Sequence, residues 1–258
     1  MGILAMIDMR GLVLTVALAG LVGAVGCRTI TEKDRQSSDI HYDLGVQAQQ
    51  SGKMQDALDE YTRALELNPK NPQAHHAMAL LLQHAFARFD EAERHFGRAL
   101  DLEPTFTEAK VNLGNLHLQK GAYDRAIKLY EEALADMRYR TPEFAQGNLG
   151  WAEYKRGNVE KGIGHIKAAV TLNPEFCLGY RNLGQIYEER GETEDACGQY
   201  RRYREKCADV ADAHYRSGMC LAKLGRAEEA AQRFADCESL APAGELREDC
   251  ARLRTQLQ

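Results

Sequence analysis

From Ser38 onward the chain repeats itself about every 34 residues, and this period constrains the fold more than any other feature. Aligning Asp-Leu-Gly at 43–45 with Asn-Leu-Gly at 112–114, 148–150 and 182–184 gives six units, which start at residues 38, 72, 107, 143, 177 and 211. A proline closes several of them, at Pro69, Pro104, Pro174 and Pro242. Units of this length cannot bury an apolar face alone, so the period predicts a stack with one continuous core.

Four positions recur in these units. Position 8 is small: Gly45, Ala79, Gly114, Gly150, Gly184 and Gly218. Position 20, shifted by one in the second unit, is also small: Ala57, Ala92, Ala126, Gly162, Ala196 and Ala230. Position 24 is aromatic or branched: Tyr61, Phe96, Tyr130, Ile166, Tyr200 and Phe234. Position 15 supplies a helix-ending glycine in five units.

This pattern resembles the tetratricopeptide repeat, whose period is about 34 residues. The resemblance implies an all-α fold, in which six helix-turn-helix repeats over residues 38–244 form a right-handed superhelix with a concave face. Residues 245–258, with Leu246 and Leu253 on one apolar side, are expected to form a capping helix.

The rest of the sequence gives no sign of catalysis. The formal net charge of −5 argues against a sequence-independent nucleic-acid binder, and 44% hydrophobic residues exclude wholesale disorder. The known nucleotide-binding, hydrolase and metalloprotease motifs do not occur in it. We therefore expect that the protein is not an enzyme and that it binds neither a cofactor nor a small-molecule substrate.

The histidines are interpreted as structural. His41, His75 and His214 occupy position 4, where the family carries an aromatic residue such as Trp, and His117 occupies position 11, usually Tyr. We expect these four to pack in the core. His75 and His76 are adjacent on a helix and point about 100° apart, which makes them a poor chelating pair, so no metal site is predicted.

The N-terminal region predicts export. Residues 11–26 are uncharged and apolar, but this run is shorter than the roughly 20 residues that span a membrane, so it fits the core of a signal peptide. Translation starts at Met1 or at Met9. Ala24-Val25-Gly26-Cys27 resembles a bacterial lipobox, which implies removal of residues 1–26 and lipidation of Cys27. An uncleaved anchor, or an ordinary signal peptide with an incidental cysteine, is the alternative.

The residues after Cys27 bear on location and reach. Arg28 stands where an aspartate would retain a lipoprotein in the inner membrane under the enterobacterial sorting rule. By resemblance, the protein is therefore expected at the outer membrane, lipid-anchored and facing the periplasm. Residues 27–37 are polar without an apolar period, and we expect them to form a flexible tether.

The other six cysteines lie in the C-terminal third. Facing residues of an antiparallel helix pair are about equidistant from the turn that joins the two helices. Three pairs meet this condition: Cys177–Cys207, Cys197–Cys220 and Cys237–Cys250. Export permits disulfides, so we expect each pair to join neighbouring helices. The alternative is six free thiols that fill small core positions.

The concave face is the candidate binding site. In tetratricopeptide repeats a partner usually lies along the inner helices and contacts positions 2, 5, 9 and 12. The candidate residues at these positions are Tyr42, Val46, Leu80, Val111, Leu118, Phe144, Trp151, Tyr154, Arg181, Tyr215 and Met219. A mainly apolar groove suits an amphipathic helix or an extended apolar segment. Alternatively, some of these side chains pack against a neighbouring repeat.

A lipobox followed by six such repeats resembles the type IV pilus pilotins of the PilF/PilW/Tgl type. The closest local resemblance is YRTPEFAQGNLGWAEYKRGN at residues 139–158, the junction of the third and fourth repeats. The resemblance implies a lipoprotein that binds subunits of the outer-membrane secretin of the type IV pilus, promotes their multimerisation and supports motility. The cysteine-rich final third is not general to that family. The alternative is another envelope scaffold, in β-barrel assembly or peptidoglycan synthesis.

Overall fold

The computed structural model describes residues 29–257, all of whose regular structure is helical. The expected signal peptide (residues 1–26) and the expected lipidation site Cys27 lie outside these residues. The first helices of the six repeats are α1 (Glu32–Gln50), α3 (Pro72–His84), α5 (Thr107–Gln119), α7 (Pro142–Lys155), α9 (Cys177–Glu189) and α11 (Ala211–Lys223). The second helices are α2 (Met54–Leu67), α4 (Phe89–Leu102), α6 (Tyr123–Leu134), α8 (Val159–Leu172), α10 (Thr193–Lys206) and α12 (Ala227–Leu240). The final helix is α13 (Glu245–Gln256).

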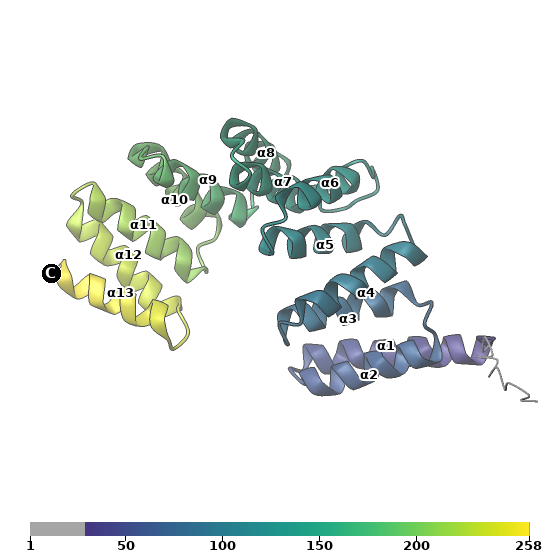
Figure 1. Cartoon of the computed structure of the whole chain (residues 1–258). Coiled ribbons are helices and arrows are strands. Elements are labelled where there is room, and N and C mark those ends of the chain that lie inside the picture. Colours follow the sequence, from purple (N-terminus) through teal and green to yellow (C-terminus); the bar gives the residue numbers. More distant parts are fainter. Residues whose placement is uncertain (1–28, 258) are drawn as a thin grey trace, which may run out of the picture.

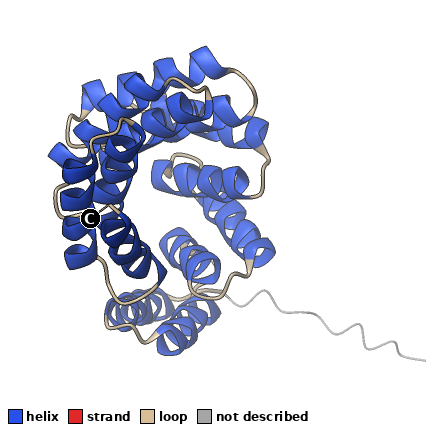
Figure 2. Ribbon diagram, turned by 90° about the vertical axis from the view of Figure 1, so that its left-hand side faces the viewer, coloured by secondary structure: helices blue, strands red, loops and turns tan. Residues whose placement is uncertain are grey.

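The helices stack in chain order along a curved path from α1 to α13 (Figure 1). Seen from a second direction, the same stack curls round on itself (Figure 2). Successive first helices contact one another from α1 to α3, α5, α7 and α9, as expected on the inner, shorter side of a curved array. The core runs along the stack as successive apolar clusters, so each repeat is stabilised by its neighbours.

The recurring small residue lets the two helices of a repeat approach closely. A Cβ atom added to Gly45 would lie 2.5 Å from the ring of Tyr61, the position-24 side chain of the same repeat. In the fourth repeat the approach is between backbones, because a Cβ on Gly150 would lie 2.6 Å from the carbonyl oxygen of Gly162. The position-24 side chains are among the largest that are fully buried. The sequence pattern of small and bulky positions therefore describes the packing within each repeat.

The first helix is longer than the sequence pattern indicated. We expected residues 27–37 to form a flexible tether, but α1 begins at Glu32, so that expectation is wrong from residue 32 onward. The helix start is fixed by a capping box: Thr31 Oγ1 accepts a hydrogen bond from the Asp34 amide at 3.1 Å, and the Asp34 carboxylate accepts one from the Thr31 amide at 3.0 Å. This first turn is stabilised by its cap and by acidic residues rather than by burial. A search for periodic apolar residues therefore cannot detect it.

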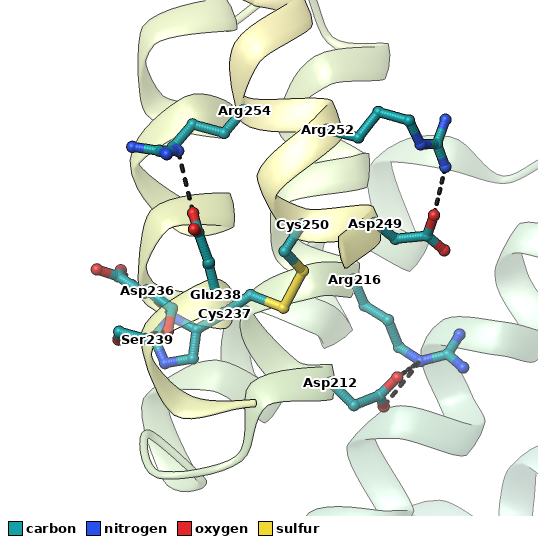
Figure 3. The surroundings of a disulfide bond; sticks show 11 residues. Asp212, Arg216, Asp236, Cys237, Glu238, Ser239, Asp249, Cys250, Arg252 and Arg254 are labelled. Carbon is teal, nitrogen blue, oxygen red and sulfur yellow. Dashed lines mark hydrogen bonds and ion pairs between the residues drawn. A yellow bond between two sulfur atoms is a disulfide. The ribbon is translucent and has the colours of Figure 1, made fainter. Parts of the chain in front are cut away.

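Three disulfides join the last helices. Cys177–Cys207 links α9 to the end of α10, Cys197–Cys220 links α10 to α11, and Cys237–Cys250 links α12 to α13, with Cα–Cα distances of 6.0, 5.4 and 6.1 Å. They are the three pairs predicted from symmetry about the turns. Figure 3 shows Cys237–Cys250 beneath the pair Arg254–Glu238, whose Nε and Oε2 atoms are 3.2 Å apart.

The four histidines that were expected to pack in the core divide into two groups. His117 and His214 are buried, at 6% and 7% exposure, as expected for core substitutions. His41 and His75 are only partly buried and instead form polar pairs between the two helices of a repeat. His41 Nδ1 lies 2.6 Å from Glu60 Oε2, and His75 Nδ1 lies 3.0 Å from His95 Nδ1. The expectation of core packing is therefore wrong for these two, because position 23 of their repeats supplies a polar partner.

Candidate protein-binding groove

The candidate groove residues lie on the first helices and are mostly accessible in part. Phe144 is 43% exposed and contacts Phe176 edge-on, with ring centroids 5.2 Å apart. Val111 is the exception, because it is 5% exposed and packs in the core of the third repeat. The partly buried members are Tyr42, Val46, Leu80, Leu118, Trp151, Tyr154, Arg181, Tyr215 and Met219.

A small pocket marks the junction of the third and fourth repeats. It has a volume of about 140 Å³, and its lining residues are Glu108, Val111, Asn112, Asn115, Tyr139, Phe144 and Asn148. Val111 and Phe144 were predicted, and they come from α5 and α7. Tyr139 was not predicted, because it lies in the connection between these repeats rather than at a groove position. The lining combines one aliphatic and two aromatic side chains with three asparagines and the Glu108 carboxylate, which suits one apolar side chain of an incoming segment.

Asparagine side chains link the first helices across this face. Asn112 Nδ2 donates to His76 Nε2 of the preceding repeat at 2.9 Å. Asn115 Oδ1 accepts from Tyr130 Oη at 2.8 Å and from Asn148 Nδ2 of the following repeat at 2.8 Å. The Asn-Leu-Gly repeats define the period but do not by themselves predict these contacts. The recurrence of asparagine at position 6 was the signal that could have identified this network.

An aromatic pair lies on α7, next to the pocket. The rings of Trp151 and Tyr154 have centroids 5.4 Å apart, and Lys155 Nζ lies 4.7 Å from the Trp151 centroid. The Tyr154 hydroxyl donates to Glu189 of α9. Burial and this hydrogen bond raise the pKa of Tyr154 to about 12, so the phenol stays neutral. Trp151 is partly buried against the apolar cluster of the fourth and fifth repeats, and the exposed remainder of its indole is a candidate contact for a protein partner.

The C-terminal part of the groove has fewer free groups. Arg181 Nε donates to Asp212 Oδ2 at 3.1 Å, so its charge is already paired within the protein. Tyr215 and Met219 pack against the cluster around Phe234, which Leu246 and Leu253 of α13 complete. Phe144 on α7 is therefore the most exposed of the candidate groove residues, whereas Arg181, Tyr215 and Met219 are engaged within the protein.

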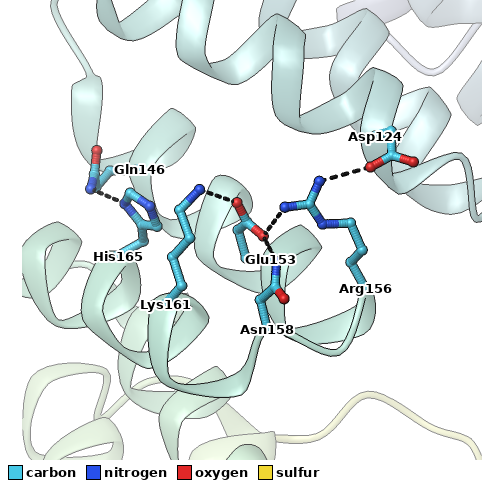
Figure 4. A network of polar contacts seen from close by, with 7 residues as sticks. All are labelled: Asp124, Gln146, Glu153, Arg156, Asn158, Lys161 and His165. Atoms are coloured by element: carbon cyan, nitrogen blue, oxygen red, sulfur yellow. Dashed lines mark hydrogen bonds and ion pairs between the residues drawn. The ribbon is translucent and has the colours of Figure 1, made fainter.

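A buried carboxylate holds α7 in place. Glu153 has no exposed side-chain surface, and its oxygens accept from Arg156 at 2.7 Å, from Asn158 at 2.8 Å and from Lys161 (Figure 4). Burial raises the pKa of Glu153, but the hydrogen bonds from Lys161 and Asn158 outweigh this effect and hold it below its ordinary value. Arg156 also pairs with Asp124 of the preceding repeat at 2.8 Å. The network thus fixes both the turn after Trp151 and the contact between the third and fourth repeats.

Within residues 29–257 no helix combines the length and apolar character needed to cross a membrane. Likewise, within the described chain, no group of three or more His, Cys, Asp or Glu side chains is arranged to hold a metal ion.

Family models for tetratricopeptide repeats match most of the chain, at residues 49–84, 84–147, 148–211 and 181–243. None of these models describes a catalytic family. Among curated proteins, the CTR9 homolog of Arabidopsis thaliana is 24% identical over 233 residues, which are 74% of this chain and 21% of that protein. The chain therefore spans about a fifth of the length of this relative.

Two solved structures share the arrangement of repeats. PilW, described as a widely conserved type IV pilus biogenesis factor, is 24% identical with a TM-score of 0.72, and the match covers 84% of this chain and 99% of PilW. PilF of Pseudomonas aeruginosa is 18% identical with a TM-score of 0.68, and the match covers 86% of this chain and 99% of PilF. At these identities the likeness shows a common fold. The repeat matches and the observed six helix pairs lead to one conclusion: the chain belongs to the tetratricopeptide-repeat family.

Proposed function

We propose that this protein is an outer-membrane lipoprotein that binds subunits of the type IV pilus secretin through its concave groove and promotes their multimerisation. The observation that carries the proposal is the match to PilW and PilF, which extends over 99% of each of those chains. Tetratricopeptide repeats bind protein partners, and here the pocket between α5 and α7 and the exposed ring of Phe144 offer a contact surface. Lipidation of Cys27 and the outer-membrane location rest on the sequence alone.

The groove supports a mechanism of shielding. The pocket at the junction of the third and fourth repeats, the exposed ring of Phe144 and the Trp151–Tyr154 pair offer apolar contacts, while the Asn112 and Asn148 amides are held by hydrogen bonds to the preceding repeat. An apolar secretin segment bound here would be kept from water until assembly buries it against other subunits. Anchoring by Cys27 would hold the complex at the membrane in which the pore is assembled.

The first experiment is genetic. In a strain that lacks the gene, we expect heat-stable secretin multimers and pilus-dependent motility to be lost, and the wild-type gene to restore both. Complementation with Cys27→Ser is expected to give the secretin monomer without normal multimers, because the protein loses its anchor. Normal multimers in the deletion strain would overturn the proposal and favour another envelope scaffold.

The second experiment addresses the groove. Trp151→Ala should weaken secretin capture by about 2 kcal/mol, roughly 30-fold, if this indole is a binding hot spot. Leu172→Ala is the control, because Leu172 is 57% exposed at the end of the second helix α8. Equal losses in the two variants, measured with the purified secretin domain, would argue against the groove.

A further inference from the structure

A pair of histidines in the second repeat brings two potential metal-ligand nitrogens within hydrogen-bonding distance of each other. His75 on α3 and His95 on α4 bring their Nδ1 atoms to 3.0 Å from each other, with the rings tilted by 41°. If each nitrogen formed a metal bond of about 2.0–2.1 Å, the angle at the metal would be roughly 90–97°. This is close to the right angle between neighbouring ligands in tetragonal sites, whereas a tetrahedral site would need a wider separation. The geometry therefore favours Cu²⁺ or Ni²⁺ over Zn²⁺.

The surroundings of His75 prepare its Nδ1 atom to act as a ligand. His75 Nε2 lies 3.2 Å from the carbonyl oxygen of Pro69, to which only an Nε2–H group can donate. The proton of the neutral ring is therefore on Nε2, which leaves a lone pair on Nδ1. A histidine ligand commonly donates its second ring nitrogen to a carbonyl in this way. Without metal, the His95 Nδ1–H group donates to this lone pair.

Both rings are neutral near pH 7. Burial lowers the pKa of His75, and burial together with the neighbouring His75 lowers the pKa of His95 to about 4. Glu91, one turn before His95, contributes negative charge beside the pair and is held by Arg88. Arg98 near His75, and Arg94 and Arg88 near His95, act in the opposite direction, so a bound cation has to be held by its nitrogen ligands rather than by the surrounding charge.

We propose that His75 Nδ1 and His95 Nδ1 bind one Cu²⁺ ion, with water completing its coordination. When the ion binds, the proton on His95 Nδ1 is lost to solvent and another is taken up at Nε2, so the ring stays neutral and the net proton count is unchanged. The site lies between the helices of one repeat rather than on the groove positions, and it does not depend on the proposed function. It was not visible in the sequence, because the two ligands are 20 residues apart.

The experiment is a Cu²⁺ titration of the full exported chain without a histidine tag, at pH 7.5 with glycine present to suppress weak surface binding. Calorimetry should give one saturable site, and electron paramagnetic resonance of the bound Cu²⁺ should give hyperfine coupling from two nitrogens. His75→Gln is the main variant, because the equivalent positions in the fourth repeat hold Gln146 and His165, with Nε2 and Nδ1 2.8 Å apart. The fold therefore tolerates an amide at this position. We expect a loss of affinity greater than the roughly 10–100-fold that typically follows removal of a ligand's hydrogen-bond partner, because the variant removes a ligand itself.

Two further variants make the result specific. His41→Ala removes a partly exposed histidine of the first repeat and should leave the affinity unchanged. Gln146→His should create a second site with His165, because it places two imidazoles at the positions of the proposed pair. A wild-type spectrum with one nitrogen or none would overturn the proposal, as would equal affinities of wild type and His75→Gln.

Discussion

The backbone contact between the two helices of the fourth repeat can be tested by adding a single carbon atom. At Gly150 on α7, a new Cβ would lie 2.6 Å from the carbonyl oxygen of Gly162, 2.7 Å from Ile166 Cγ1 and 2.9 Å from the Ile166 amide nitrogen. Two of these three atoms belong to the backbone of α8. They cannot move unless the helix moves, so Gly150→Ala should push α7 and α8 apart.

The expected magnitude follows from two opposing effects. Replacing a helical glycine by alanine stabilises a helix by about 1 kcal/mol. Overpacking a core typically costs about 1–3 kcal/mol and occasionally more, and a backbone obstacle places this case at the upper end. The net result should be a loss of about 2 kcal/mol. Gly164→Ala in α8 is the matched control, because a Cβ there meets no atom within 4 Å, so it should stabilise the fold by about 0.5–1 kcal/mol.

The assay is urea unfolding followed by two probes, tryptophan fluorescence and circular dichroism. Trp151 is the only tryptophan, and it is adjacent to Gly150, so its fluorescence reports the fourth repeat directly. Circular dichroism reports all the helices, and the two midpoints separate if the array does not unfold as one unit. Gly218→Ala should fall between the two variants, because its Cβ meets only the ring of Phe234, a side chain. Equal midpoints for Gly150→Ala and Gly164→Ala would refute the reasoning.

Three other perturbations have definite expected outcomes. Replacing Cys237 and Cys250 together by alanine should lower the free energy of unfolding by about 3 kcal/mol, because their separation of 13 residues closes a short loop; an unchanged urea midpoint would contradict this. Lys161→Met should cost more than Glu153→Gln in the same assay, because it leaves a buried carboxylate with fewer partners whereas the glutamine carries no charge; the opposite order would refute it. Burial lowers the pKa of His76 to about 4 from an ordinary value of 6.5, so the unfolded chain binds more protons between these values. Stability should therefore be retained above pH 6.5 and lost as the pH falls toward about 4, whereas a flat profile of urea midpoint against pH would contradict this.

Periodicity predicted the features that every repeat shares. The small residue at position 8 and the bulky one at position 24 pack as expected, for example at Gly45 and Tyr61, because a packing rule that recurs six times leaves a strong pattern. The disulfides could be paired for a similar reason, since antiparallel hairpins relate residues by symmetry about a turn. Both predictions rest on geometry that is local in sequence.

Features that depend on one particular neighbour were not predicted. The start of α1 at Glu32 depends on hydrogen bonds between Thr31 and Asp34, which leave no apolar period. Val111 occupies a groove position, but its neighbours in the third repeat bury it. The contacts of Asn148 with Asn115, and of His75 with His95, join residues 33 and 20 positions apart, and a single sequence does not reveal which polar groups meet over such distances.

The central proposal is that the concave face binds the pilus secretin, and site-specific photo-crosslinking tests it most directly. A photoreactive phenylalanine analogue would replace Phe144 in the groove or, as the control, Leu172 on α8, since both side chains are exposed, at 43% and 57%. In cells that assemble the pore, we expect a crosslink to the secretin from position 144 and none from position 172. Crosslinks from position 172 alone, or none to the secretin from position 144, would contradict the account.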